Sequence, residues 1–218
     1  MAQIHTREHR APSVRVRTGT TSLRAVREEA RHCRDCPLWR DATQTVFGEG
    51  RARAAVMLVG EQPGDQEDLA GKPFVGPAGR MLDKAFAELR VDRADVFVTN
   101  AVKHFKFEQR GKRRLHKKPT DGEIAVCHQW LDREMALVRP RLVVAMGATA
   151  ARSLFGKATA IERNRGRIIE SQVSGLPADI LVTIHPSFLL RMPPEDKPAA
   201  FARFVADLRL ALPYLKDT

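Results

Sequence analysis

Long hydrophobic runs are missing from this 218-residue sequence, and none approaches the length that a membrane-crossing helix needs. The opening segment, MAQIHTREHRAPSVRVRTGTT (residues 1–21), is rich in arginine but lacks the continuous apolar core of a secretory signal, so we expect a flexible basic arm. Cysteine is also scarce. Three cysteines, an odd number, argue against a disulfide framework and for a reducing compartment, which predicts a cytoplasmic protein.

Acidic residues are too few to balance the basic ones. Asp and Glu number 26 against 37 Lys and Arg, which gives a net charge of +11. A polyanion is the natural partner of such a chain, with nucleic acid ahead of a membrane surface, although a solvated basic face is the alternative. The hydrophobic content of 43% is ordinary for a globular protein, and the length suits one domain, which we expect over residues 22–218.

Four short apolar runs, rich in β-branched residues, predict strands that are buried on both faces of a parallel sheet. They lie at Ala54–Gly60, Asp95–Asn100, Arg141–Gly147 and Asp179–Pro186. Helical patterns precede, separate and follow them, at residues 22–33, 76–90, 120–138, 148–156 and 196–212. Because strands and helices alternate, we expect an α/β fold, a three-layer αβα sandwich around a mainly parallel central sheet of about four strands.

Two helix ends carry clear signals. Thr120 followed three residues later by Glu123 predicts a capping box, and Gly156 is suited to a C-cap. Ligands of parallel sheets bind at the carboxyl ends of the strands. Here the segments at these ends are GEQPGDQED, TNAVKH, GATA and HPSFLLR, and three of the four are rich in polar or ionisable groups. We therefore expect the functional site along this edge of the sheet.

The cysteines favour a metal centre. Cys33 and Cys36, in CRDCP, have the spacing with which two thiolates bind one metal centre, and they end a helix rather than follow a strand, unlike a thioredoxin-type pair. Cys127 could add a third thiolate, and His104 a fourth ligand, because imidazole replaces thiolate in some iron–sulfur centres. The spacing leaves zinc, an iron–sulfur cluster and a merely buried Cys127 open.

Several motifs resemble the family-four iron–sulfur uracil-DNA glycosylases. They are VFGEG, GEQPGDQEDLAGKPFVGPAGRMLD, TNAVKH and HPSFLLR, in this order and with C-x-x-C upstream, and the resemblance runs from about Cys33 to the C-terminal helix. Two departures, together with Gln62 after Glu61, are similar to the UdgX type of these enzymes. His104 stands where the family has a cysteine, and the chain carries a basic loop that the family lacks, FKFEQRGKRRLHKKP.

The resemblance implies a [4Fe–4S] cluster held by Cys33, Cys36, His104 and Cys127. It also implies that the partner is uracil-containing DNA. We expect a monomer. Single-stranded DNA is the expected preference, because an unpaired base costs less to extrude.

For the uracil pocket, the resemblance implies four residues. Phe74 would stack on the ring, and Asn100 would hydrogen-bond N3–H and O4. Gln62 and Gly64 would offer backbone N–H groups, because a close backbone approach needs small residues. Without the resemblance, core packing explains Phe74, and a strand-end turn explains Asn100.

Cleavage of the glycosidic bond leaves negative charge on uracil and an oxocarbenium-like sugar. By the resemblance, His185 donates a hydrogen bond to uracil O2, and Glu61 is the carboxylate near C1′, with Asp65 as its helper. We expect the other acids of this motif, Glu67 and Asp68, to be solvated or to cap a helix. A turn residue before proline is the alternative for His185.

His116 lies among five cationic side chains in GKRRLHKKP. Composition alone favours one more backbone contact in a nucleic-acid-binding loop. UdgX-type enzymes, however, end their reaction covalently attached to DNA through a histidine of this loop. The resemblance therefore makes His116 a nucleophile that attacks C1′ before water does.

Further polar residues of this loop and of HPSFLLR are expected to contact phosphates or to anchor the loop, and one of the two loop arginines could instead pack inward and lock it. These residues are Lys112, Arg113, Arg114, Lys117, Lys118, Ser187 and Arg191.

Two other functions stay open at this point. A conventional multi-turnover iron–sulfur glycosylase would use water in place of His116 and release an abasic site. A non-catalytic iron–sulfur protein that binds DNA or senses redox state would explain the charge. It would leave Glu61, Asn100 and His185 at three strand ends without a shared purpose.

Overall fold

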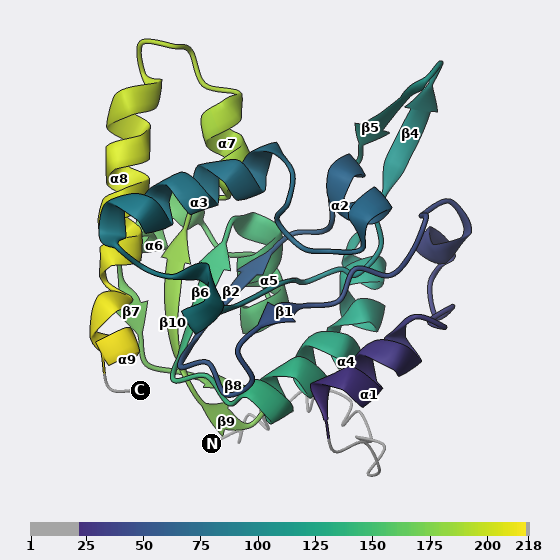
Figure 1. Cartoon of the computed structure of the whole chain (residues 1–218), viewed down its shortest axis with the longest axis horizontal. Coiled ribbons are helices and arrows are strands. Elements are labelled where there is room, and N and C mark those ends of the chain that lie inside the picture. Colours follow the sequence, from purple (N-terminus) through teal and green to yellow (C-terminus); the bar gives the residue numbers. More distant parts are fainter. Residues whose placement is uncertain (1–21, 217–218) are drawn as a thin grey trace, which may run out of the picture.

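The central sheet has six strands in the order β1-β3-β2-β6-β10-β7 (Figure 1). The computed structural model describes residues 22–216, so the expected arm at residues 1–21 lies outside the described residues. Four parallel strands confirm the expected ones: β2 (Val56–Gly60), β3 (Phe97–Asn100), β6 (Leu142–Met146) and β10 (Asp179–Thr183). Two short strands, β1 (Glu49–Gly50) and β7 (Ile168–Ile169), pair antiparallel at the edges. The expected fold class is confirmed.

Helices cover both faces of the sheet, as Figure 1 shows. One layer contains α3 (Pro77–Leu89), α7 (Pro186–Leu190) and α8 (Lys197–Arg209), and the other contains α4 (Asp121–Val138) and α5 (Ala148–Phe155), with α1 (Leu23–Ala30) beside α4. Successive strand residues point to opposite layers, so Leu58 packs in the α3–α8 core and Val59 in the α4–α5 core. This double burial explains the continuous apolar runs of the sequence.

Both expected helix-end signals are confirmed. The Thr120 amide donates to Glu123 Oε2 at 2.6 Å, and the Glu123 amide donates to Thr120 Oγ1 at 3.3 Å, which is a capping box at the start of α4. Gly156 ends α5 with a φ of +68°, in the left-handed region. The expected C-terminal helix is interrupted: α8 ends at Arg209, and α9 follows at Leu212–Lys216.

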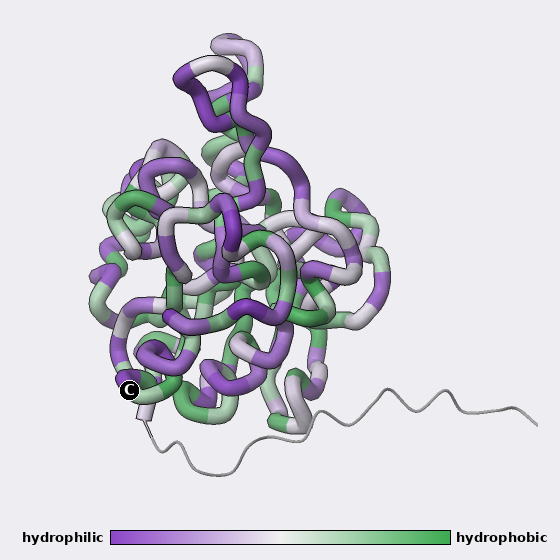
Figure 2. Tube along the Cα trace, turned by 90° about the vertical axis from the view of Figure 1, so that its right-hand side faces the viewer, coloured by the Kyte–Doolittle hydropathy of each residue, from purple (hydrophilic) through white to green (hydrophobic). Residues whose placement is uncertain are grey.

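The basic segment is a β-hairpin rather than the loop expected from the sequence. β4 (Phe107–Arg110) pairs antiparallel with β5 (Arg113–His116), and Phe107 faces His116 in the register. Gly111 has a φ of +56°, which suits the first position of a two-residue hairpin turn. The hairpin projects from the body in Figure 1, and at the top of Figure 2 it is mainly hydrophilic.

Short elements complete the described chain. They are the helices α2 (Asp65–Ala70) and α6 (Ile161–Asn164), the 3₁₀ turns Pro37–Arg40 and Arg93–Asp95, and the strands β8 (Gln172–Val173) and β9 (Leu176–Pro177). None of the helices in residues 22–216 is long and apolar enough to span a membrane.

A buried ion pair fixes the carboxyl end of β3. Lys103 Nζ lies 2.7 Å from Glu134 Oε2, and both side chains are 0% exposed. The same ammonium donates to the Asn100 carbonyl and to Thr99 Oγ1, each at 2.7 Å. The carboxylate of Glu134, on α4, also accepts from the Gly48 amide at 2.8 Å. Because a buried charge is stable only when it is paired and hydrogen-bonded, this network holds Asn100 in one position.

Candidate active site

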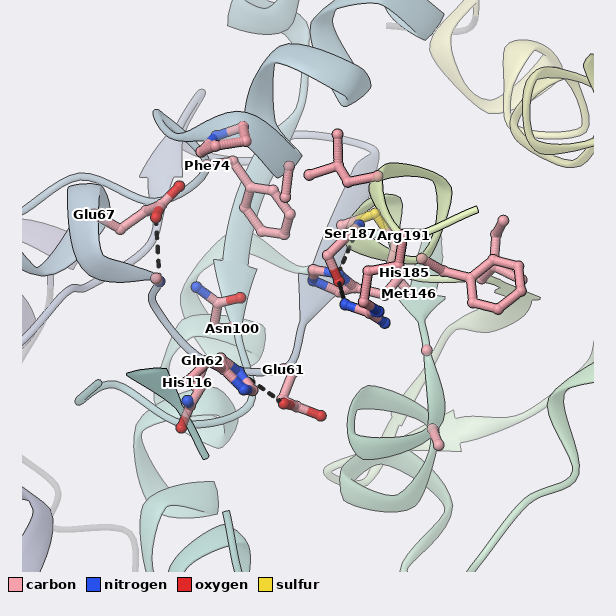
Figure 3. A pocket seen from close by; sticks show the side chains of 18 of the residues that line it. Glu61, Gln62, Glu67, Phe74, Asn100, His116, Met146, His185, Ser187 and Arg191 are labelled. Atoms are coloured by element: carbon pink, nitrogen blue, oxygen red, sulfur yellow. Dashed lines mark hydrogen bonds and ion pairs between the residues drawn. The ribbon is translucent and has the colours of Figure 1, made fainter. Parts of the chain in front are cut away.

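A cavity of about 850 Å³ opens at the carboxyl edge of the sheet. Its polar lining includes residues at three strand ends: Glu61 follows β2, Asn100 ends β3 and His185 follows β10 (Figure 3). The fourth strand, β6, contributes Met146 and Gly147. The parallel order of these strands brings together residues that lie far apart in the sequence, at the edge where ligands of such sheets bind.

Asn100 presents an unsatisfied acceptor to this cavity. Within residues 22–216, Asn100 Oδ1 is the one buried side-chain nitrogen or oxygen that lacks a hydrogen-bond partner. Gly60 keeps the space in front of it open, because a Cβ there would lie 2.4 Å from Oδ1 and 2.5 Å from the Phe74 ring. A buried acceptor without a partner carries a desolvation penalty that a ligand N–H donor can remove.

Phe74 forms an apolar wall beside Asn100. Its side chain is buried, and its φ of +54° is unusual for a bulky residue. The first turn of α3 allows this conformation, because Gly79 has no Cβ to clash with the Phe74 carbonyl, which would lie 1.9 Å away. The ring centroid is 5.8 Å from that of His185. A flat ligand between these groups would meet an aromatic face and a polar edge.

His185 is a neutral hydrogen-bond donor in this cavity. Its Nδ1 accepts from the Ser187 amide at 3.2 Å, so a neutral ring carries its proton on Nε2. Ser187 Oγ lies 2.8 Å from Nδ1 and accepts from Arg191 at 3.2 Å. Burial lowers the pKa of His185 to about 4, although the nearby Glu61 carboxylate acts in the opposite direction.

Glu61 is held between two donors. Its Oε1 lies 3.1 Å from His116 Nε2, and its Oε2 accepts a hydrogen bond from the Thr149 hydroxyl. Burial opposes the ionisation of Glu61, but the hydrogen bonds from His116 and Thr149 outweigh it, and the pKa of this carboxyl lies below its usual range. The His116 side chain is 50% exposed, at the mouth of the cavity.

Arg114 anchors the hairpin that carries His116. Its Nε donates to Asp65 Oδ1 at 2.5 Å, and its Nη1 donates to Asp68 Oδ2 at 2.6 Å. The guanidinium carbon lies 5.1 Å from the centroid of the Phe107 ring, so the group is also stacked on the hairpin. Of the two loop arginines, Arg114 therefore packs inward, and Arg113 is exposed.

Gln62 ties down the base of the same hairpin. Its Nε2 donates to the Lys106 carbonyl at 3.1 Å and to the Lys117 carbonyl at 3.0 Å, and its Oε1 accepts from the Lys106 amide at 3.3 Å. Sequence reasoning had assigned only the backbone of Gln62. The side chain instead links the end of β2 to the residues that flank the two hairpin strands.

The acids and the glycine after Gln62 differ in part from expectation. Glu67 caps two helices, as expected, because it accepts from the Gly64 amide at 3.1 Å and from the Gly76 amide at 2.7 Å. The bond from the Gly64 amide competes with the expected use of this amide for uracil.

Asp68 is neither solvated nor a helix cap, so the expectation for this residue is wrong. It is 0% exposed and accepts hydrogen bonds from Arg114 and from the Thr43 amide. Asp65 lines the cavity but pairs with Arg114.

Other cationic residues of the hairpin point outward. Lys112, Arg113 and Lys118 are exposed and form none of the ion pairs found among residues 22–216. Lys117 Nζ lies 2.7 Å from Glu108 Oε2. These exposed cations suit contact with a phosphate backbone.

The three cysteines belong to one hydrophobic cluster. Cys127 is buried there with Val102 and Trp130, and Cys33 and Cys36 pack against this cluster. The sulfurs accept hydrogen bonds: Cys33 Sγ from Trp130 Nε1 and Cys127 Sγ from the Lys103 amide, each at 3.2 Å. Burial raises the pKa of the Cys127 thiol to about 12, so a thiolate here requires a cation beside it.

His104 presents a nitrogen that suits a fourth ligand. Thr45 Oγ1 donates its proton to the Ala30 carbonyl at 2.8 Å, so it accepts from His104 Nε2 at 3.0 Å, and Nδ1 carries the lone pair of the neutral ring. In the described part of the chain, no three His, Cys, Asp or Glu side chains converge as ligands of one ion would.

Residues 47–209 match the family described as the Uracil DNA glycosylase superfamily. The type-4 uracil-DNA glycosylase of Pyrobaculum aerophilum is 33% identical over 192 residues, which cover 86% of this chain and 92% of that protein. That of Thermotoga maritima is 36% identical over 171 residues, 78% of this chain and 83% of that protein. A type-5 uracil-DNA glycosylase of P. aerophilum is 30% identical over 55% of this chain and 58% of that protein.

Loss of the Arg114 side chain is predicted to loosen the hairpin. Arg114→Ala leaves the buried Asp68 carboxylate without its cation, and we expect a loss of about 2–4 kcal/mol in the free energy of unfolding, less than for a fully buried pair because Asp65 is half-exposed. Arg113→Ala, at the exposed neighbour, is the matched control and should stay within about 0.5 kcal/mol of the unchanged protein. Urea unfolding measures both, and equal effects would contradict this assignment.

The ring of His185 is predicted to stay neutral down to about pH 4. The unfolded chain takes up this proton near the usual pKa of about 6.5, so His185 should lower the stability as the pH falls from there toward 4. An NMR titration of the histidine ring signals, with His185→Asn for assignment, measures the midpoint. A midpoint near 6.5 would show that this ring is not desolvated.

Proposed function

The chain belongs to the uracil DNA glycosylase superfamily, and from that membership we propose that it excises uracil from DNA and becomes covalently linked to the deoxyribose C1′ through His116. This is the reaction of the UdgX type. The observation that carries the proposal is the contact between His116 Nε2 and Glu61 Oε1, at 3.1 Å, on the rim of the cavity. It places a second potential nucleophile, besides water, next to the carboxylate that would face C1′.

Recognition of uracil would use the unsatisfied Asn100 acceptor. Uracil N3–H is a donor, and it would remove the penalty of leaving Oδ1 without a partner. The Asn100 amide nitrogen would donate to O4, and Phe74 would stack on the ring. Gly60 supports this assignment, because any side chain there would fill the space that the base needs.

Departure of the base would depend on His185. The glycosidic bond breaks with its electron pair on uracil N1, and the negative charge spreads to O2. Because His185 Nδ1 is occupied by the Ser187 amide, the Nε2–H is the donor toward O2. A neutral imidazole fits this role over the physiological range, since the pKa of His185 is lowered to about 4 by burial.

The covalent step would follow at C1′. The oxocarbenium-like sugar is stabilised by the Glu61 carboxylate. A ring nitrogen of His116 supplies an electron pair to C1′, which leaves the ring positively charged. The ring then loses its N–H proton to Glu61, and Glu61 passes this proton on to the departing uracil anion or to solvent. The new C1′–N bond replaces the broken C1′–N bond of uracil, so the balance needs no further reactant. Each molecule would react once.

The exposed cations of the hairpin would hold the DNA backbone while this occurs. Three of these cations form no ion pair among the described residues: Lys112, Arg113 and Lys118. Lys117 forms an ion pair with Glu108. Arg114 anchors the hairpin and is not a phosphate contact. Ser187 and Arg191, next to His185, line the cavity and suit the phosphates beside the flipped nucleotide.

We propose single-stranded DNA as the preferred substrate, because an unpaired uracil costs less to extrude. We further propose a cytoplasmic monomer whose residues 22–218 form one catalytic domain.

The residues around the cysteines support a [4Fe–4S] cluster, with Cys33, Cys36, Cys127 and His104 Nδ1 as the ligands. When bound, the cluster would supply a positive centre that stabilises the thiolates and joins three segments of the chain. Cys127 and Lys103 are linked by a hydrogen bond, and Lys103 holds the Asn100 carbonyl, so the cluster region supports the uracil pocket. We propose a structural role for it.

A denaturing gel tests the covalent reaction. The protein is mixed with a labelled single-stranded oligonucleotide that contains one uracil, and the mixture is boiled in detergent. We expect a band at the summed mass of protein and DNA, which is absent with a thymine oligonucleotide and with His116→Ala. Free DNA that breaks at the uracil position under hot alkali would instead identify a conventional glycosylase. An oligonucleotide that stays intact would exclude both enzyme functions.

The iron content tests the cofactor. We expect a brown protein with absorbance near 400 nm and about four irons per chain. Cys127→Ser should lose most of this absorbance, because Cys127 is the most deeply buried of the proposed thiolate ligands. Replacement of the exposed His32, close to the same segment, is the control and should leave the iron content unchanged. A colourless protein that contains zinc would contradict this assignment.

A further inference from the structure

Thr149 contacts the carboxylate that faces the cavity, and sequence reasoning assigned it no role. It lies in the first turn of α5, directly after the end of β6, and its side chain is 1% exposed. Its hydroxyl donates to Glu61 Oε2, while Glu61 Oε1 faces His116 Nε2. The two oxygens of one carboxylate therefore have different partners, one inside the protein and one on the hairpin.

This arrangement fixes the orientation of the Glu61 side chain. A carboxylate rotates readily about its terminal bond, and a single hydrogen bond from a half-exposed histidine would leave that rotation open. The buried Thr149 hydroxyl removes it, because α5 and β2 belong to the rigid core of the domain. Oε1 then points toward His116 before any DNA is bound.

We propose that Thr149 is a positioning residue that directs the reaction toward capture by His116 rather than by water. The proposal rests on the proposed covalent function and adds a determinant of its outcome. Thr149 does not line the cavity, so it acts through Glu61 and not on the substrate.

The effect should fall on the partition between products more than on base release. Base release depends on Asn100, His185 and the charge of Glu61, and the attraction between charges changes slowly with small shifts in position. Capture by His116 depends on a hydrogen bond to Glu61, which weakens steeply when its geometry is lost. A loosened Glu61 would therefore still stabilise the sugar cation but would no longer align His116, and water would compete.

The test is the ratio of covalent adduct to free abasic product in a single turnover on a uracil oligonucleotide. Thr149→Val keeps the shape of the side chain and removes the hydroxyl, and we expect the ratio to fall about 10-fold while total uracil release stays within about threefold. Thr149→Ser keeps a hydroxyl and should restore the ratio. Thr149→Ala is a second variant without the hydroxyl, in case the valine variant does not fold.

Ser153→Ala is the matched control. Ser153 lies on the same helix, is buried, and uses its hydroxyl on His128 Nδ1 at 3.0 Å, away from Glu61. The ratio of covalent adduct to free abasic product for Ser153→Ala should equal that of the unchanged protein. A folded Thr149→Val or Thr149→Ala protein with an unchanged ratio would overturn the inference, and so would an equal fall in Ser153→Ala. If the unchanged protein forms no adduct, the covalent function itself fails, and this inference fails with it.

Discussion

The pairing of the Arg114 guanidinium with Asp65 and Asp68 is the contact on which the candidate site depends. The Phe107 ring stacks on the buried Phe105 ring, with centroids 5.1 Å apart, but a two-stranded hairpin is only marginally stable alone. Arg114 ties it to α2, and Gln62 ties its base to the end of β2. Because Asp68 is fully buried, the cation cannot leave without a large free-energy cost. The position of His116, two residues further along the same strand, follows from this anchor.

Two histidines then face the same cavity in different electrostatic surroundings. His185 is desolvated and has its Nδ1 filled by a backbone amide, which leaves a neutral Nε2–H donor. His116 is half-exposed, and its contact with the Glu61 carboxylate keeps the ring oriented and helps to lower the pKa of that carboxyl. In the proposed reaction one ring would stabilise the leaving anion, and the other would approach the carbon that the anion leaves. The environments, rather than the residue type, separate the two roles.

Much of this arrangement could be predicted from the sequence, for specific physical reasons. Strands buried on both faces leave continuous apolar runs, and parallel strands bring their carboxyl ends to one edge, so the meeting of Glu61, Asn100 and His185 was predictable. Which of the two loop arginines packs inward was not, because the sequence predicted a loop rather than a hairpin for the basic segment. In a hairpin the period is two, so Arg114 and His116 share a face and Arg113 lies on the other, and that pattern would have identified it. Contacts between distant side chains, such as Thr149 with Glu61 and Arg114 with Asp68, leave no local pattern in the sequence.

The most direct test of the central claim is the site of attachment in the adduct. The protein that has reacted with a uracil oligonucleotide is digested with nuclease and protease, and its peptides are sequenced by mass spectrometry. We predict a deoxyribose-containing mass on His116 and none on the peptides that contain Glu61 or His185. Attachment to another residue, or unmodified peptides beside abasic DNA, would contradict the account.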